Sequence, residues 1–191
     1  MIGLLVGSFD PVHHGHLIAG QALFEQLGLS ELRFVPAFDQ PLKGGRHGAV
    51  AADRVAMVEL AVQGARGFAV ERVEVERAGR SYTVETLRQL RAREPGSRFV
   101  LLIGSDAVRD LPQWREAAML RELAEVVAFG RAGRPAEPTP LVDRRVDVPA
   151  VDISSTEIRR RVAAGLSIRY WVPDAVERFI TERGLYRKTE A

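Results

Sequence analysis

The sequence contains no cysteine. This absence excludes a disulfide framework, a cysteine nucleophile and a thiolate zinc site, and it is compatible with a reducing compartment. Long apolar runs are also lacking. The first segment, MIGLLVG, carries no basic leader and is too short for a signal peptide or a membrane span. We therefore expect a cytoplasmic protein without a membrane partner.

Lysine is scarce, and charge of either sign is dispersed. Lysine occurs only at Lys43 and Lys188, the formal net charge is +2, and the arginines are scattered among acidic residues. A nucleic-acid partner requires a basic block or stripe, which this pattern does not provide. An acidic small-molecule substrate stays open.

Length and hydrophobic patterning predict one α/β domain, residues 1–191. The chain has 191 residues, 46% of them hydrophobic, which is enough for one buried core and short for two. Short apolar runs alternate with amphipathic stretches, which favours a doubly wound parallel sheet of about five strands with helices on both faces. We expect strands at 2–6, 32–36, 68–75, 99–103 and 125–129, and helices at 16–27, 50–63, 83–93, 114–123, 155–164 and 174–183. The last two helices would form a small C-terminal segment, about 153–186, packed on the domain.

Two loops stand out by their glycine and proline content, at residues 37–48 and 131–140. Each is either a substrate lid or a simple connection. Sheets of the expected kind bind ligands outside the carboxyl ends of their strands, where the strand order reverses.

The stretch GSFDPVHHGH, residues 7–16, holds three of the four histidines directly behind the first expected strand. His13 and His16 are three residues apart around a helix start, so their imidazoles can converge beside free backbone N–H groups. This arrangement favours a phosphate site. A metal site with Asp10 as third ligand ranks second, and His14 is the member most readily explained as a surface residue.

Three further stretches carry polar groups at expected strand ends or helix starts. In ISSTEIRRR (153–161), Ser154 or Ser155 caps a helix and Glu157 can close a capping box. The hydroxyls of Ser154, Ser155 and Thr156, with Arg159 one turn later, also suit a polyphosphate. In LLIGSDAVRDLPQW (101–114), Asp106 is either a helix cap or a ribose ligand, and Trp114 either core or a stacking surface. In RSYTVETL (80–87), Thr83 is predicted as a helix cap.

Together these stretches resemble the HxGH nucleotidylyltransferases, and more closely the bacterial nicotinate mononucleotide adenylyltransferases. GSFDPVHHGH resembles the family motif (G/S)xFDPxHxGH, SYTVETL resembles SYTxxTL, GSDAVRDLPQW resembles GxDxxxxxxxW, and ISSTEIR resembles ISSTxIR. The ending YWVPDAVERFITERGLY is similar to the family's closing segment. The resemblance covers nearly the whole chain and implies a Rossmann-like fold.

The resemblance also implies roles for individual residues. The catalytic set would be His13, His16, Lys43 and Arg159. The residues binding ATP would be Gly7, Ser8, Phe9, Gly104, Asp106, Ile153, Ser154, Ser155 and Thr156. The residues binding nicotinate mononucleotide would be Thr83, Trp114 and Arg131. Leu42 stands where the family loop usually has histidine, so one donor is missing there.

The implied reaction is attack by the 5′-phosphate of nicotinate mononucleotide on the α-phosphorus of ATP, giving deamido-NAD and pyrophosphate. The nucleophile is already ionised at neutral pH, so no general base is needed and catalysis rests on alignment and donors. Mg²⁺ is the expected cofactor, bound mainly through the ATP phosphates, with no protein metal site. Nicotinamide mononucleotide or another phosphate acceptor, and a regulator that binds nucleotide without turnover, are the alternatives. Homo-oligomerisation stays open.

Overall fold

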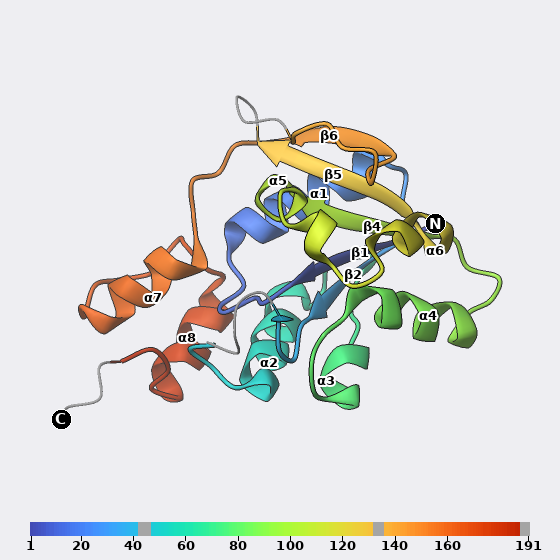
Figure 1. Ribbon diagram of the computed structural model, residues 1–191. Helices are drawn as coiled ribbons and strands as arrows, with labels where there is room; N and C mark the ends of the chain where they lie inside the picture. Colours follow the sequence, from blue (N-terminus) through green and yellow to red (C-terminus); the bar gives the residue numbers. More distant parts are fainter. Residues whose placement is uncertain (42–46, 132–135, 188–191) are drawn as a thin grey trace.

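The computed structural model describes residues 1–41, 47–131 and 136–187. Six parallel strands form one sheet in the order β3-β2-β1-β4-β5-β6 (Figure 1). The strands are β1 (Ile2–Gly7), β2 (Glu31–Pro36), β3 (Phe68–Val70), β4 (Phe99–Gly104), β5 (Glu125–Arg131) and β6 (Arg144–Val148). The order reverses between β1 and β4, which are paired in parallel with Leu5 opposite Leu102. The predicted doubly wound α/β sheet is thus confirmed, and its switch point lies between these two strands.

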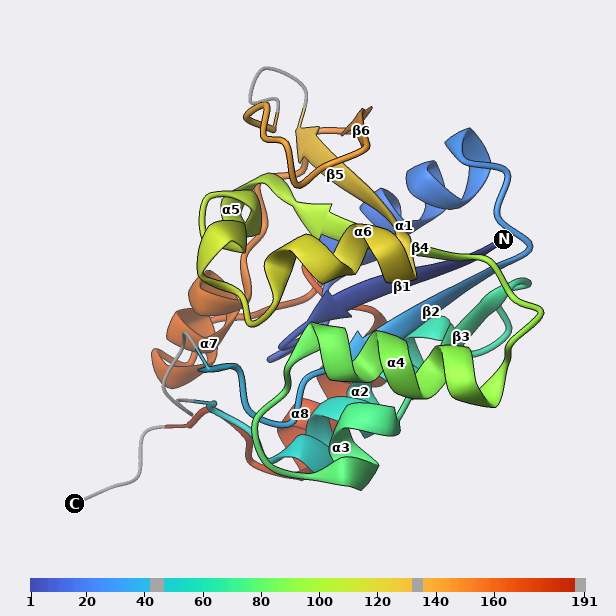
Figure 2. The same ribbon diagram turned by 45° about the vertical axis from the view of Figure 1, so that its right-hand side comes forward.

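Helices cover both faces of the sheet, because consecutive strand residues point to opposite sides. One face packs on α1 (His14–Gln26), α2 (Ala51–Val62), α7 (Ser155–Ala163) and α8 (Asp174–Glu182). The other packs on α3 (Val73–Arg77), α4 (Thr83–Arg93), α5 (Ser105–Val108), η2 (Leu111–Gln113) and α6 (Leu120–Leu123). Figure 2 shows α4 and α6 in front of the sheet and α1 behind it. Leu5 and Leu102 belong to the first core, whereas Leu4 and Leu101 belong to the second.

The expectation of about five strands missed β6. Its sequence, RRVDV, carries three charged residues in five, and only Val148 is buried. An edge strand needs little apolar surface, so its hydrophobic signal is weak.

Two other expectations were wrong in their extent. The strand expected at 68–75 ends at Val70, because the Glu71 carboxylate accepts the Val73 backbone N–H at 3.1 Å and a short helix, α3, begins there. The helix expected at 114–123 is broken: Glu116 adopts a left-handed φ of 51°, and only η3 (Ala117–Met119) and α6 follow. Trp114 therefore lies in extended backbone between two short helices.

The C-terminal helices α7 and α8 lie at the end of the sheet to which the strand arrows point (Figure 1). Ile158 of α7 and both Val176 and Ile180 of α8 are buried in the core shared with α1 and α2. The C-terminal segment therefore packs at the edge where a ligand is expected. Among the described residues, no helix is both long and apolar enough to cross a bilayer.

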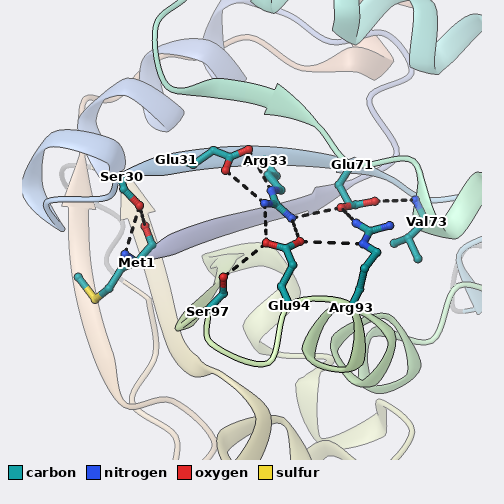
Figure 3. A network of polar contacts seen from close by, with 9 residues as sticks. All are labelled: Met1, Ser30, Glu31, Arg33, Glu71, Val73, Arg93, Glu94 and Ser97. Carbon is teal, nitrogen blue, oxygen red and sulfur yellow. Dashed lines mark hydrogen bonds and ion pairs between the residues drawn. The ribbon is translucent and has the colours of Figure 1, made fainter.

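A network of charged residues joins β2 to the end of α4 (Figure 3). The Arg33 guanidinium donates to Glu94 at 2.5 and 2.9 Å and to Glu31 at 3.0 and 3.2 Å. It also contacts Glu71 at 3.4 Å, and Arg93 pairs with Glu71 from the other side. The hydrogen bonds from Arg33 lower the pKa of Glu94 below its ordinary value of 4.5. The network thus supplies Arg33, a residue of β2, with acidic partners that compensate for the partial burial of its charge.

We predict that Glu94→Gln lowers the free energy of unfolding by about 1 to 2 kcal/mol at pH 7, because a charge-assisted hydrogen bond is lost. Glu94 has a lowered pKa in the folded state, so its contribution is present above about pH 4.5 and disappears as the pH falls through that lowered pKa. Urea unfolding should show a difference in the free energy of unfolding between wild type and Glu94→Gln, and this difference should be smaller at pH 4 than at pH 7.

Glu157→Gln is the matched control, because Glu157 also pairs with an arginine, Arg160, but on an exposed helix face. It should change stability less than Glu94→Gln at both pH values. Equal unfolding midpoints for wild type and Glu94→Gln at pH 7 would contradict a stabilising role for the network.

Candidate active site

The switch point brings Gly7, the last residue of β1, beside the end of β4 at Gly104. A Cβ at Gly7 would lie 3.1 Å from the ring of Phe9, a contact tight enough to require a shift of that ring. Phe9 is itself buried, with a left-handed φ of 48°, and its ring packs against the rings of His16 and Phe34. The backbone of residues 7–9 is thereby held close to the sheet edge, so Phe9 contributes packing to the site.

The two predicted histidines come together at the start of α1. His13 is the N-cap and His16 the third helical residue, and their rings stack with centroids 3.7 Å apart. The His13 backbone N–H donates to His16 Nδ1 at 3.3 Å, and Phe9 packs edge-on against His16. Because Nδ1 accepts, a neutral His16 carries its proton on Nε2 and remains a donor there.

Gly15 lies close to the stacked histidine pair. A Cβ at Gly15 would lie 3.0 Å from His13 Nδ1 and 3.7 Å from the Ile153 carbonyl oxygen. The two motifs 7–16 and 153–161 therefore approach each other at this glycine.

The start of α7 is docked directly on the first motif. Ser154 is the N-cap and accepts the Glu157 N–H at 3.2 Å, as predicted, while the Glu157 carboxylate pairs with Arg160. Ser155 donates from Oγ to the Pro11 carbonyl at 2.9 Å. Arg159 donates to the Asp10 carbonyl at 2.7 Å and to Thr156 Oγ1 at 3.3 Å. Two helix starts and a guanidinium thus converge on one turn, which is the arrangement expected for a polyphosphate.

Asp10 is buried, and its carboxylate is occupied by other protein groups. It accepts the N–H of Gly48 at 2.6 Å, the N–H of Ala49 at 3.1 Å and the Tyr186 hydroxyl at 2.7 Å. These bonds tie the turn to the loop before α2 and to the C-terminal end. The alternative of a metal site that includes Asp10 is disfavoured, because its oxygens are already engaged with N–H and O–H donors.

Arg54 was missed by the sequence analysis. It is fully buried and donates to three backbone carbonyls, those of Ser8 at 2.8 Å, Phe38 at 3.0 Å and Ala49 at 3.3 Å. Burial lowers its pKa, and the nearby Asp10 carboxylate opposes that shift. Arg54 therefore links the first motif to both ends of the loop before α2. Its position on the buried face of an amphipathic helix, one turn before Met57 and Val58, was the available signal.

A pocket of about 200 Å³ lies next to the switch point, and we call it the Trp114 pocket. It is lined by Val6, Gly7, Ala37, Gln40, Pro41, Glu74, Ser81, Tyr82, Thr83, Ala107, Asp110, Gln113, Trp114 and Arg115. Both Thr83 and Trp114, predicted on separate motifs, are in this set. Thr83 is the first residue of α4 and Tyr82 its N-cap, so the predicted cap was misplaced by one residue.

Glu74 is a buried acid in the wall of the Trp114 pocket. It accepts a hydrogen bond from Thr86 Oγ1 at 2.7 Å and another from Ser81, while burial raises its pKa. Ser81 Oγ in turn accepts the Phe38 N–H at 2.9 Å. Glu74 thus fixes the SYTVETL segment against the loop that follows β2.

The remaining predicted residues have different placements. Ser8 donates to Gln40 Oε1 at 2.7 Å, so its hydroxyl faces the loop after β2. Asp106 is exposed in the first turn of α5, with Gly104 as N-cap, and Ile153 packs partly buried on the core. Lys43 and the side chain of Arg131 lie outside the described residues.

Comparisons with known proteins agree with this geometry. The cytidylyltransferase-like family model matches residues 4–161. The chain is 47% identical to a "Probable nicotinate-nucleotide adenylyltransferase" from Thermus thermophilus, over 97% of this chain and 99% of that one. It is 42% identical to a protein of the same description from Thermomicrobium roseum, over 100% and 93% of the two chains.

The fold is shared with a solved structure of nicotinic acid mononucleotide adenylyltransferase from Plasmodium falciparum, described as complexed with NaAD. The TM-score is 0.78 at 18% identity, with 97% of this chain and 96% of that chain covered. On this evidence the chain belongs to the cytidylyltransferase-like family and, within it, to the nicotinate-nucleotide adenylyltransferases.

Proposed function

We propose that the protein transfers the adenylyl group of ATP to nicotinate mononucleotide, forming deamido-NAD and pyrophosphate in NAD biosynthesis. One observation carries the proposal: β1 ends at Gly7 in the lining of a tryptophan-walled pocket and is followed by a histidine pair at the start of α1, in a chain 47% identical to a relative of this description. The two features suit the two halves of the reaction, phosphoryl chemistry and recognition of a flat ring.

The phosphate half of the site would bind ATP through donors alone. His13 and His16 lie at the start of α1, next to the turn on which Ser155 and Arg159 of α7 dock. In our proposal these groups bind the triphosphate and stabilise the charge that develops on the α-phosphate and on departing pyrophosphate. Lys43 would add a further cation, and Gly104 with Asp106 would bind the adenosine ribose.

The acceptor phosphate needs no general base, because it is ionised at neutral pH. The protein's contribution to its attack is alignment, which is worth several orders of magnitude when reacting atoms are held in contact. The Trp114 indole would stack on the pyridine ring, while Thr83 and the N–H groups of the α4 start would face its carboxylate. Arg131 is proposed to contact the same substrate.

Mg²⁺ is proposed to enter with ATP. The site's described polar groups are mainly N–H and O–H donors, and the buried Asp10 carboxylate is occupied by three protein donors. Such a donor set binds phosphate oxygens, so the cation would be held by the phosphates and water and would supply charge neutralisation.

We predict that purified protein releases pyrophosphate from ATP with nicotinate mononucleotide at a kcat/KM at least about tenfold above that with nicotinamide mononucleotide. The amide's NH₂ group would oppose the donors that suit a carboxylate, and each factor of ten corresponds to about 1.4 kcal/mol. Pyrophosphate release should be measured with both mononucleotides and with phosphopantetheine. Nucleotide binding without turnover on any acceptor would favour a regulator and contradict the proposal.

His16→Ala should lower kcat with nicotinate mononucleotide by roughly 10² to 10³, because one transition-state donor is removed. His16→Gln, which can return an N–H donor near the Nε2 position, should recover part of the rate. His14→Ala, two residues away at the same helix start, is the control and should stay near wild type. Wild-type turnover in His16→Ala, with an unchanged unfolding midpoint, would refute the assignment of His16 to the phosphates.

A further inference from the structure

We propose that Arg115 is a specificity-determining residue whose guanidinium binds the carboxylate of the pyridine ring in the Trp114 pocket. The inference rests on the proposed function and goes further by naming the side chain that separates the acid from the amide.

Arg115 is the one cationic side chain among the described residues that line the Trp114 pocket. Two acids, Glu74 and Asp110, also line it. An ionised acid beside a bound carboxylate would repel it, so a pocket that prefers the acid is served by a compensating cation. Thr83 and the α4 start offer only partial charge, whereas a guanidinium offers a full one with paired donors.

The position of Arg115 fits this role. It directly follows Trp114, the proposed stacking surface, and its guanidinium carbon lies 4.8 Å from the centroid of the Tyr82 ring. Its Nη1 lies 2.8 Å from Glu85 Oε1. Tyr82 is the N-cap of α4 and Thr83 its first residue, so Arg115 extends from the tryptophan wall to the helix start that faces it.

The pair with Glu85 leaves Arg115 able to bind a ligand. The side chain of Arg115 is 51% exposed and that of Glu85 is 33% exposed. Ion pairs of this exposure contribute little, so a guanidinium can reorient toward a second carboxylate at small cost. Its five N–H donors also permit simultaneous bonds to Glu85 and to a ligand. Stacking on Tyr82 keeps the group at the pocket while it does so.

Glu74 cannot replace Arg115 as the selecting group. It is buried, and its carboxylate is engaged by hydrogen bonds from Thr86 and Ser81. Its contacts hold the wall of the pocket in place, and an acidic side chain offers no positive charge that would favour a carboxylate over an amide. Selection between a carboxylate and an amide requires a group whose interaction differs between them.

The test compares Arg115→Gln with wild type, using kcat/KM for nicotinate and nicotinamide mononucleotides at saturating ATP. Loss of the cation should lower kcat/KM for nicotinate mononucleotide by about tenfold, while kcat/KM for nicotinamide mononucleotide stays within about twofold. The preference for nicotinate mononucleotide would then be lost. The loss should appear in KM and not in kcat, because the ring carboxylate takes no part in bond formation. Arg115→Lys should recover part of the preference.

Two further variants separate charge from wall structure. Arg115 pairs with Glu85 at 2.8 Å and with Glu116 at 3.8 Å. Glu85→Gln removes the nearer competing carboxylate, so it should leave the preference for the acid unchanged or larger. Arg121→Gln is the matched control, because Arg121 on α6 forms an ion pair with Asp143 and does not line the pocket. Two results would overturn the inference and assign Arg115 a structural role. One is an equal loss of kcat/KM for both mononucleotides in Arg115→Gln, and the other is a loss of the preference for the acid in Glu85→Gln.

Calorimetric titration of each mononucleotide into wild type and Arg115→Gln gives a readout independent of turnover. Weaker binding of the acid alone supports the inference, and unchanged binding of the acid overturns it. Failure of the proposed function is distinguishable, since wild type would then release no pyrophosphate with either mononucleotide. Failure of the inference would leave wild-type turnover and preference intact while Arg115→Gln behaves like wild type.

Discussion

The buried carboxylate of Asp10 joins three segments that are distant in the sequence. It accepts backbone N–H groups from Gly48 and Ala49 and the hydroxyl of Tyr186, and the carbonyl of the same residue accepts Arg159. A buried charge is tolerated only when donors surround it. These donors therefore fix the histidine-bearing turn, the loop before α2 and the C-terminal segment in one arrangement, and the phosphate half of the site depends on it.

Arg54 and Glu74 extend the same principle to the rest of the site. Arg54 is fully buried and donates three hydrogen bonds to backbone carbonyls, which fixes main chain on both sides of the loop after β2. Glu74 receives hydroxyl donors from the start of α4. Removing either partner of such a contact leaves a polar group unsatisfied, which typically costs about 1 to 3 kcal/mol. The site is therefore built on buried polar contacts, whereas the two cores beside the sheet are apolar.

The two halves of the site differ in how their charges are held. At the proposed phosphate half, donors are held by burial and by helix starts, which would suit groups that must be in place when charge develops. At the Trp114 pocket, the cation Arg115 is half exposed and shared with Glu85. In the proposed role, this arrangement would suit selection between similar ligands, because it would add affinity for one ring substituent without entering the reaction. Catalysis and selection can then vary separately.

The sequence by itself determined the features that depend on contacts within about four residues. Alternating apolar runs predicted the parallel sheet and its two helical layers, and the Ser154 cap and the His13–His16 pair follow from spacing around a helix start. The charged edge strand β6, the short helix α3 and the break at Glu116 were not predicted, because tertiary neighbours and one left-handed residue decide them. Two hydrogen bonds between distant residues were not predicted either. Tyr186 donates to Asp10, 176 residues away, and Arg54 donates to the Ser8 carbonyl, 46 residues away. Nothing in a local pattern states which carbonyl or carboxylate a side chain will reach, since only the packed sheet brings those segments together.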